Sequence, residues 1–177
     1  MKGLTGQKQW FAIRTKYRGE KYVQNLLARK DIEVYLPLKN YTRHYASKIK
    51  HYKVPLLPCF VFVYIDKKEY IPVLETPYVA GFVRIGREIL PVKEEEMHIL
   101  RSIEGSGLDI TISEEPFTPG QEVFINQGPL YGLKGVITRV QSKDKFMVSL
   151  ETLPLSIVME IDKKSISHCM SQSAALV

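Results

Sequence analysis

A chain of 177 residues fits one ordinary domain or two small ones. Its composition, 45% hydrophobic and 25% charged, is that of a globular protein and excludes a disordered tail protein. The polar start of the chain and its short apolar runs predict neither a signal peptide nor a membrane span, so we expect a cytoplasmic protein without membrane contact. Cys59 and Cys169 are too far apart in the sequence to indicate a metal cluster or a disulfide framework.

The net charge of +6 is distributed unevenly along the chain. Through Ile65 there are 13 Lys and Arg against three acids, a net of +10, whereas the remainder has 12 basic and 16 acidic residues, a net of −4. No acid occurs between Glu33 and Asp66. A field of one sign attracts a polyanion, most often nucleic acid, with salt-sensitive affinity. The alternative is a solvated hairpin that keeps the protein soluble.

The first 65 residues alternate between strand and helix patterns. In chain order we expect a strand, a helix, an alternating strand, a basic hairpin tip and a second strong strand, at Gln9–Thr15, Glu20–Lys30, Ile32–Asn40, 41–53 and Cys59–Ile65. The last segment carries β-branched and aromatic residues on both faces, which predicts a central strand covered on both sides.

Asp66 is a candidate N-cap for a helix that runs to about Glu75. Pro72 would cost roughly 3 kcal/mol inside a helix, so this helix is either short or broken. Further along we expect a pair of strands and a helix with acids in its first turn, at Val79–Ile85, Ile89–Val92 and Lys93–Ile103. Helices and strands that alternate around one antiparallel or mixed sheet form an α+β sandwich.

The remainder of the chain changes character. Small residues, paired acids and prolines at 107–116 predict a linker between a first domain, 1–106, and a second domain, 117–171, with a tail at 172–177. The second domain has four strand patterns bounded by turn residues, at Glu122–Ile125, Gly135–Gln141, Phe146–Leu150 and Ile157–Ile161. Such short, regularly spaced strands favour a small closed or SH3-like β-barrel.

A glycine pattern makes the second domain more specific. Residues 120–139, GQEVFINQGPLYGLKGVITR, resemble the KOW motif, in which an apolar strand is followed by Gly128-Pro129, Gly132 and Gly135. These glycines allow backbone conformations closed to residues with a Cβ, so that the chain can reverse tightly between two strands. The spacing does not match a phosphate-binding loop. KOW motifs also occur in ribosomal proteins.

Upstream residues narrow the choice. Four segments resemble the NGN domain of the NusG family, in the same order and at similar spacing. They are Trp10-Phe11 at the start of a strand, the helix after Arg18-Gly19, the segment 57–63 (LPCFVFV) and residues 79–86. The resemblance covers nearly the whole chain and implies an NGN-type sandwich followed by a KOW barrel. The wide basic hairpin and the short connection at 86–91 look closer to the specialised RfaH and UpxY antiterminator groups than to the housekeeping factor.

The resemblance implies a first partner. NGN domains dock an apolar patch on the clamp helices of the largest RNA polymerase subunit and suppress pausing. Matching positions make Leu57, Pro58, Phe60 and Phe62 the candidate polymerase-binding residues. Because alternate residues of a strand share a face, Phe60 and Phe62 lie on one side and Val61 on the other. Ordinary core packing is the alternative for each.

A second implied partner is the non-template DNA strand. The candidate residues are basic or polar side chains of the first helix and the hairpin, Arg18, Lys21, Asn25, Arg43, His44 and Lys48. Flipped bases would stack on Tyr41 or Tyr45. A solvated charged tip is the alternative for any one of them.

The KOW domain of the family recruits a small-subunit ribosomal protein or the termination factor Rho. Leu130, Tyr131 and Leu133 are the candidate contacts here, with barrel core as the alternative. In RfaH this region also folds as a helical hairpin, but the Val, Ile and Phe of this chain, with dense Gly and Pro, predict the β form.

We therefore expect a non-catalytic, monomeric transcription elongation or antitermination factor without cofactor or metal. The four histidines lack metal-ligand spacing, and no nucleophile elbow, dinucleotide loop or paired-carboxylate pattern occurs. The alternative is a KOW-containing RNA-binding protein of the ribosome or translation apparatus.

Overall fold

The computed structural model describes residues 6–45, 47–106, 110–113, 121–128, 130–140, 143–150, 152–153, 155–160 and 163–168. The chain divides into two compact units, Met1–Gly107 and Leu108–Val177. Several sequence-based expectations lie outside the described residues: the tail at 172–177, residues 107–109 and 114–116 of the linker, Pro129, and the last residues of two predicted strands, 141 and 161.

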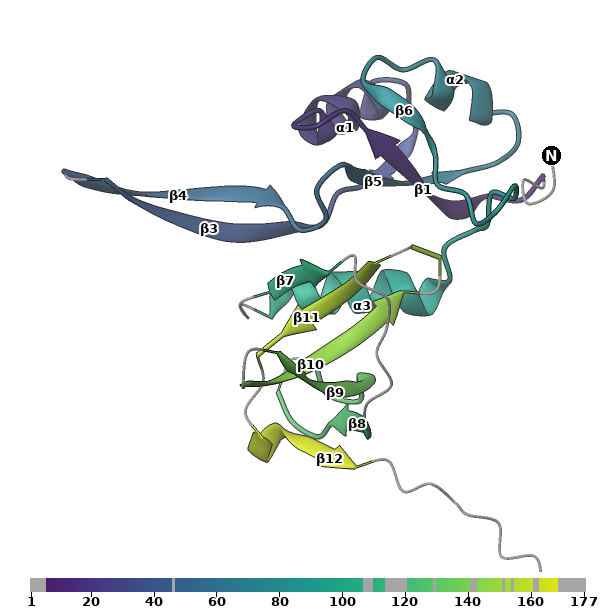
Figure 1. The fold of residues 1–177 in the computed structure, drawn as a ribbon. Coiled ribbons are helices and arrows are strands. Elements are labelled where there is room, and N and C mark those ends of the chain that lie inside the picture. The colour runs from purple at the N-terminus through teal and green to yellow at the C-terminus, as the bar shows by residue number, and fades with distance from the viewer. Residues whose placement is uncertain are drawn as a thin grey trace, which may run out of the picture. The chain divides into compact units, whose positions relative to one another are not determined.

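The first unit is built on a four-stranded antiparallel sheet in the order β2-β5-β1-β6 (Figure 1). Its strands are β1, β2, β5 and β6, at Gln9–Thr15, Glu33–Tyr35, Phe60–Ile65 and Val79–Phe82. The strand β5 lies between β2 and β1, and five of its six residues are buried. The predicted central strand covered on both sides is therefore confirmed.

Two helices, α1 (Glu20–Ala28) and α2 (Tyr70–Leu74), lie on the same side of this sheet in Figure 1. The core on this side joins residues of both helices to the inward residues of β1 and β5: Phe11, Ile13, Val23, Leu27, Val61, Val63, Ile65, Tyr70 and Val73. The two helices thus cover one face of the sheet with apolar side chains, which burial favours by roughly 1.5–3 kcal/mol each.

The helix α2 is short, as Pro72 predicted, but it does not begin at Asp66. Its first residue is Tyr70, and Pro72 lies in the first turn, where a missing N–H breaks no bond within the helix. The Asp66 Oδ1 instead accepts hydrogen bonds from the backbone N–H groups of Lys68 and Glu69. Asp66 therefore stabilises the turn that precedes the helix rather than capping the helix.

Of the predicted strand pair Val79–Ile85 and Ile89–Val92, the first strand is confirmed over Val79–Phe82, whereas the second strand and the pairing are wrong. The strand β6 ends at Phe82, and Ile85 forms only an isolated bridge with Glu88. Ile89 and Val92 are buried although they belong to no strand. Their apolar character reflects burial against the first unit, since hydrophobic alternation reports a buried side chain and not a paired backbone.

A third helix, α3 (Glu94–Gly105), closes the first unit. Glu96 accepts a hydrogen bond from the backbone N–H of Lys93 at 3.1 Å, which is half of a capping box. Three acids in the first turn complement the helix dipole as expected. The helix continues two residues beyond the predicted end at Ile103.

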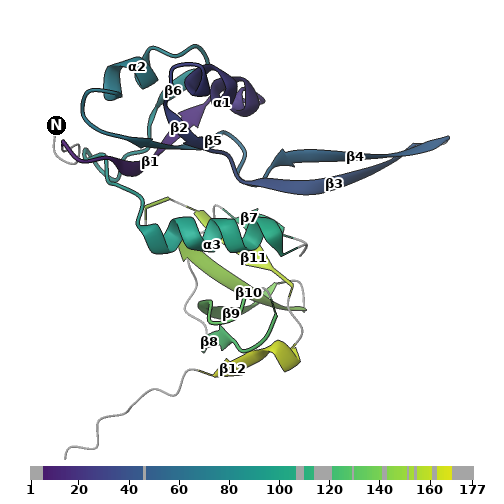
Figure 2. The same ribbon diagram turned by 180° about the vertical axis from the view of Figure 1, so that it is seen from behind.

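The basic segment forms a separate two-stranded sheet from β3 (Leu38–Tyr45) and β4 (Lys48–Pro55). Figures 1 and 2 show this hairpin projecting away from the four-stranded sheet as a long twisted ribbon. From Asn40 to Lys53 every described residue is exposed. The expected hairpin is confirmed, and its strands are longer than the predicted tip.

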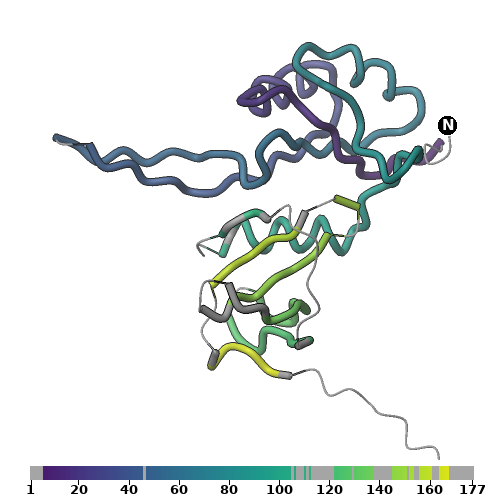
Figure 3. The backbone as a smooth tube through the Cα atoms, viewed as in Figure 1, coloured from purple at the N-terminus to yellow at the C-terminus, as the bar shows by residue number. Residues whose placement is uncertain are grey.

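The second unit is an all-antiparallel six-stranded sheet in the order β12-β8-β9-β10-β11-β7, and Figure 3 traces its path. The strands β7 to β12 are Ile110–Ser113, Gln121–Ile125, Lys134–Val140, Lys143–Leu150, Leu155–Met159 and Ile166–His168, with a 3-10 turn at Lys163–Ser165. The four predicted strands are present. No pairing of β12 with β7 occurs among the described residues, so a closed barrel is not found.

The linker prediction is wrong at Ile110–Ser113. These residues form β7, which pairs with β11 in the register Ile110 to Met159 and Ile112 to Ile157. The buried Ile110 side chain contributes to the second unit. The alternating Ile-Thr-Ile pattern in this segment, which lies between glycines and acids, indicates an edge strand.

Candidate nucleic-acid interface and aromatic face

The three predicted DNA-contact residues of the hairpin are all exposed, but they do not share one face. Arg43 pairs across the strands with Lys50, and Lys48 pairs with Tyr45. Since directly paired residues point to the same side of a two-stranded sheet, Arg43 and Lys48 lie on one face. His44 pairs with Ile49 and lies on the other face.

The three predicted residues of the first helix region, Arg18, Lys21 and Asn25, are also exposed. Lys21 and Asn25 are four residues apart and therefore share one side of α1. The Lys21 ammonium donates a hydrogen bond to the backbone carbonyl of Lys53, near the base of β4. This hydrogen bond joins α1 to the hairpin, so that the cations of both elements belong to the first unit.

Three exposed tyrosines, which were not predicted as part of the site, lie near the start of α1. Tyr17, Tyr22 and Tyr78 have exposed fractions of 70%, 51% and 49%. The Arg18 guanidinium lies 5.2 Å from the Tyr17 ring centroid, and the Tyr22 and Tyr78 rings meet edge to face at 5.2 Å. Tyr17 and Tyr22 flank the sequence Arg-Gly-Glu-Lys at 18–21, whereas Tyr78 immediately precedes β6.

The backbone at this corner is strained. Arg18, Cys59 and Tyr78 all have positive φ, at 60°, 65° and 71°, a region that costs non-glycine residues on the order of 1 kcal/mol or more. The carbonyls of Cys59 and Tyr78 each accept a hydrogen bond of 2.9 Å, from the N–H groups of Thr15 and Lys16. Strain that is held in place by such bonds concentrates at functional sites.

Glu20 anchors α1 to this corner. Its side chain is 4% exposed, and its Oε1 accepts a hydrogen bond of 2.7 Å from the N–H of Cys59. Burial, and then the Glu20 carboxylate, raise the pKa of the Cys59 thiol. The carboxylate therefore has a positioning role at the junction of α1 and β5, and the surrounding cations carry the charge of the surface.

The other face of the four-stranded sheet is aromatic. As predicted, Phe60 and Phe62 lie opposite Val61, and here they share a face with Trp10 and Tyr35. The Tyr35 and Phe62 ring centroids are 6.2 Å apart, and the Trp10 and Tyr35 centroids 6.5 Å. We call this set, together with Arg14 and Tyr64, the aromatic face.

Three of the four predicted polymerase-binding residues are buried in this structure. Leu57 and Phe62 are fully buried, and Phe60 is 7% exposed, whereas Pro58 is exposed. The Arg14 guanidinium is exposed and lies 5.2 Å from the Phe60 ring centroid. Pro58 and Arg14 are therefore the accessible side chains around this end of the aromatic face.

Polar groups of α3 contact the aromatic face. Arg101 lies 5.6 Å from the Trp10 centroid and 5.7 Å from that of Tyr35. The Tyr35 hydroxyl donates to Glu104 Oε2 at 2.8 Å, and Glu104 Oε1 accepts from the N–H of Leu38 at 3.2 Å. Burial, and then the bond to Glu104, raise the pKa of Tyr35. These contacts hold α3 over this part of the sheet.

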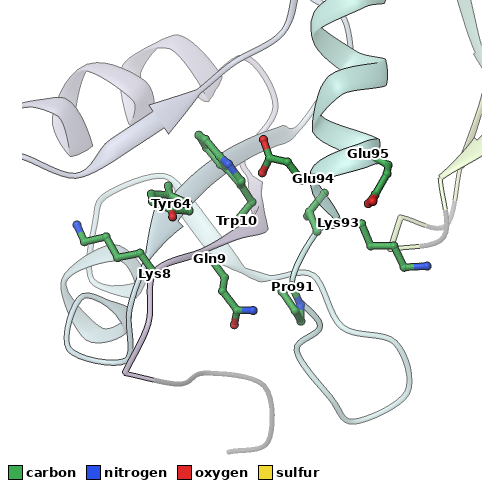
Figure 4. A pocket seen from close by; sticks show the side chains of 9 residues that line it. Lys8, Gln9, Trp10, Tyr64, Pro91, Lys93, Glu94 and Glu95 are labelled. Carbon is green, nitrogen blue, oxygen red and sulfur yellow. The ribbon is translucent and has the colours of Figure 1, made fainter.

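A pocket of about 370 Å³ opens at the Trp10 end of the aromatic face. Figure 4 shows the rings of Trp10 and Tyr64 on one side and the start of α3, with Glu94 and Glu95, on another. The Trp10 and Tyr64 ring centroids are 5.2 Å apart. Two carboxylates, Glu94 and Glu95, and two ammonium groups, Lys8 and Lys93, line this hollow, so its charge favours neither an anion nor a cation.

In the second unit, the predicted partner-binding loop joins β8 to β9. Leu130 is 3% exposed and belongs to the core, Leu133 is half-buried, and Tyr131 is 74% exposed. Gly128 and Gly132 flank Tyr131 with positive φ, as the motif predicted. Of the three candidates, Tyr131 alone presents a large accessible side chain.

The third glycine of the motif has a different role. Gly135 does not have positive φ, but a Cβ at this position would lie 2.6 Å from the carbonyl oxygen of Met147 and 2.6 Å from Phe146 Cζ. The glycine therefore permits a close approach of β9 to β10.

Within the described residues, no group of three or more His, Cys, Asp or Glu side chains is arranged to hold a metal ion. None of the helices in this described part of the chain has the length and apolar character that crossing a membrane requires.

Comparison with known proteins gives one family. A model of the family described as "NusG: Transcription termination factor nusG" matches residues 8–101. The transcription termination/antitermination protein NusG of Neisseria meningitidis serogroup B is 25% identical over 174 aligned residues, which cover 88% of this chain and 94% of that protein. A solved structure of Thermotoga maritima NusG is 22% identical, covers 92% of this chain and 97% of its own, and has a TM-score of 0.58, which indicates a similar fold.

Proposed function

This chain belongs to the NusG family, and on that premise we propose that it is a transcription elongation and antitermination regulator. It binds RNA polymerase and suppresses pausing or termination at selected operons. The observation that carries the proposal is that the family match, residues 8–101, contains both an aromatic sheet face and a cation-rich surface within one compact unit. A factor that contacts polymerase and its exposed DNA at once needs both.

The polymerase-binding site in this proposal is the aromatic face around Leu57, Pro58, Phe60 and Phe62, and its target is the clamp helices of the largest polymerase subunit. Buried aromatic anchors supply most of the energy at such interfaces. Because Phe60 and Phe62 are buried here, binding requires that the groups covering this face move aside. Pro58 and Arg14 are exposed, so the polymerase contacts them first.

The DNA-binding surface combines the strained corner around Arg18 with the hairpin, and its target is the non-template strand. Arg18, Lys21 and Asn25 act from the helix region and Arg43, His44 and Lys48 from the hairpin. The Lys21 bond to the Lys53 carbonyl, the exposed tyrosines and the absence of acids between Glu33 and Asp66 support this assignment.

In this proposal the second unit, which consists of β7 (Ile110–Ser113) and the predicted barrel region 117–171, functions as a KOW-type SH3-like barrel that recruits a small-subunit ribosomal protein or Rho. The turn glycines and the exposed Tyr131 support it. The long hairpin further supports the proposal that this chain is one of the specialised RfaH- and UpxY-type paralogues. We propose that it acts as a monomer in the cytoplasm.

The alternative, an RNA-binding protein of the ribosome, is favoured only by the KOW-like glycines. Residues 108–177 carry six Lys and Arg against eight Asp and Glu, a net of −2. A barrel embedded in ribosomal RNA needs a basic surface to neutralise phosphates. The charge of the second unit therefore favours the polymerase factor.

Affinity capture with the tagged full chain tests the proposal. Polymerase subunits recovered in stoichiometric amount after nuclease treatment support it, whereas recovery of ribosomal subunits alone supports the rival function. Pro58→Asp places a charge at the accessible edge of the site and should reduce polymerase recovery at least tenfold. Ile71→Asp is the matched control, because Ile71 is 50% exposed on α2, across the sheet from the aromatic face.

A further inference from the structure

The two faces of the β3–β4 hairpin differ in chemistry. Its strands pair so that the residue numbers of each cross-strand pair add to 93, as in Tyr41 with Tyr52 and Tyr45 with Lys48. Directly paired side chains share a face, and faces alternate along each strand. One face therefore carries Lys39, Tyr41, Arg43, Tyr45, Lys48, Lys50 and Tyr52, and the other carries Asn40, Thr42, His44, Ile49, His51 and Lys53. We call the first the tyrosine face and the second the histidine face.

All three tyrosines of the hairpin lie on the tyrosine face, and each is exposed. Tyr41, Tyr45 and Tyr52 have exposed fractions of 50%, 40% and 39%. The hydroxyls of Tyr45 and Tyr52 are 3.3 Å apart, which links the rings diagonally across the ribbon. Exposed aromatic rings are costly to keep in water, so a row of them on a projecting ribbon indicates a binding surface.

The charge of the same face identifies the partner. Four of the five Lys and Arg of the hairpin lie on it, and no acid occurs between Glu33 and Asp66. The Arg43 guanidinium lies 5.1 Å from the Tyr45 ring centroid, so a cation and a stacking surface are already combined. Cations bind the phosphates of a nucleic acid, and flat aromatic rings stack on its unpaired bases, so this face suits a single strand.

We propose that the tyrosine face is a base-stacking platform for single-stranded nucleic acid. Bases stack on Tyr41, Tyr45 and Tyr52, while Arg43, Lys48 and Lys50 neutralise the phosphates. The inference deepens the proposed function and rests on it, because it names the hairpin face and the binding mode. A duplex is a poorer ligand, since its bases are stacked on each other and offer no free π-face to a tyrosine.

The histidine face has none of these properties. It carries one Lys or Arg, Lys53, and its Thr42 hydroxyl is within 3.0 Å of His51 Nδ1. His44, a candidate from the sequence, belongs to this face and is not part of the platform. Uncharged residues can therefore be replaced on either face of the same hairpin, and both sets of variants keep all its Lys and Arg residues.

The test measures fluorescence anisotropy of labelled oligonucleotides with the full chain at two salt concentrations. The probes are an oligo-dT, an oligo-rU and a DNA duplex of equal length. The variants are Tyr41→Thr/Tyr45→Thr/Tyr52→Thr on the tyrosine face and Asn40→Thr/Ile49→Thr/His51→Thr on the histidine face, where His44 is left in place because it is a candidate DNA contact. Threonine retains strand propensity in both. A third variant changes the same tyrosines to phenylalanine.

The tyrosine-to-threonine variant should bind the single strands at least tenfold more weakly, with an unchanged salt slope because the phosphate contacts remain. The histidine-face variant should bind within twofold of the original chain. The phenylalanine variant should also stay within about threefold, because stacking needs the ring and not the hydroxyl. The tighter of the dT and rU arms identifies the natural strand as DNA or RNA.

Three results would overturn the inference: equal losses in the two threonine variants, loss of binding in the phenylalanine variant, or tighter binding of the duplex than of either single strand. Polymerase capture with the same variants separates this inference from the proposed function. If tyrosine-dependent binding is present but polymerase is not captured, the platform stands and the proposed function fails. If polymerase is captured but binding is indifferent to the tyrosines, the platform fails alone.

Discussion

At the scale of single residues, Tyr35 links the aromatic face to α3. Its hydroxyl donates to Glu104, and its burial raises its pKa. The phenol of the unfolded chain titrates near 10. The unfolded state therefore loses this proton first, so the contribution of Tyr35 to stability is complete below about pH 10 and is lost as the pH rises above it.

Tyr35→Phe should cost about 1 kcal/mol at neutral pH, because one hydrogen bond is lost. It should also flatten the fall of stability above about pH 10, because the titrating group is gone. Urea unfolding between pH 8 and 11, followed by the fluorescence of Trp10, measures both effects. Trp10 is the single tryptophan of the sequence and lies 6.5 Å from Tyr35 by ring centroids.

Tyr131→Phe is the matched control, since Tyr131 is 74% exposed. It should leave both the neutral stability and the alkaline limb unchanged. Parallel alkaline limbs for Tyr35→Phe and the original chain would show that Tyr35 is equally acidic in the folded and unfolded states, contrary to its half-buried position against Glu104.

Residue-level predictions succeeded where they depended on local pattern. The exposure of Arg18, Lys21 and Arg43 followed from charge, because isolated cations are rarely buried. The contact of Tyr22 with Tyr78 was not predictable, because four strands and the helix α2 separate them in the sequence and only tertiary folding brings them together. The burial of Phe62 was likewise not predictable, because strand alternation shows which face of the sheet Phe62 lies on but not what covers that face.

At the scale of elements, β7 is the finding that changes the domain boundaries. The strand pairs with β11, and its Ile110 is buried. A fragment that begins at 116 therefore lacks an edge strand that a fragment from 108 retains. Burial of one such side chain contributes roughly 2 kcal/mol, so the longer fragment should be more stable by about that amount.

Thermal and urea unfolding of fragments 108–177 and 116–177, followed by far-UV circular dichroism, test this expectation. Both spectra should be of β type, as the Val, Ile and Phe content predicts. A helical spectrum would contradict the prediction that this region does not switch its fold. Equal stability of the two fragments would show that β7 adds nothing to the unit.

Strands that are apolar on both faces, such as β1 and β5, were predictable because each face must meet a buried layer. The pair at 79–92 was not, because Ile89 and Val92 are buried without a backbone partner, and hydrophobic patterns do not distinguish these cases. The hairpin was predictable as an element. Its two faces became distinct only once the register of β3 and β4 was known.

At the scale of the whole molecule, the chain has two compact units with different surfaces, and the NusG family model matches residues 8–101 of the first. The first unit supplies the aromatic face and the cations, and the second supplies an acidic-to-neutral sheet with one exposed tyrosine loop. This division of charge supports the proposal that nucleic acid binds to the first unit.

The central claim is that the chain acts on elongating RNA polymerase. In vitro transcription with purified polymerase, on templates with and without a leader pause site, tests it most directly. Addition of the full chain should shorten the pause or increase read-through, Pro58→Asp should lose this effect, and Ile71→Asp should retain it. Unchanged elongation on every template with the original chain would contradict the account.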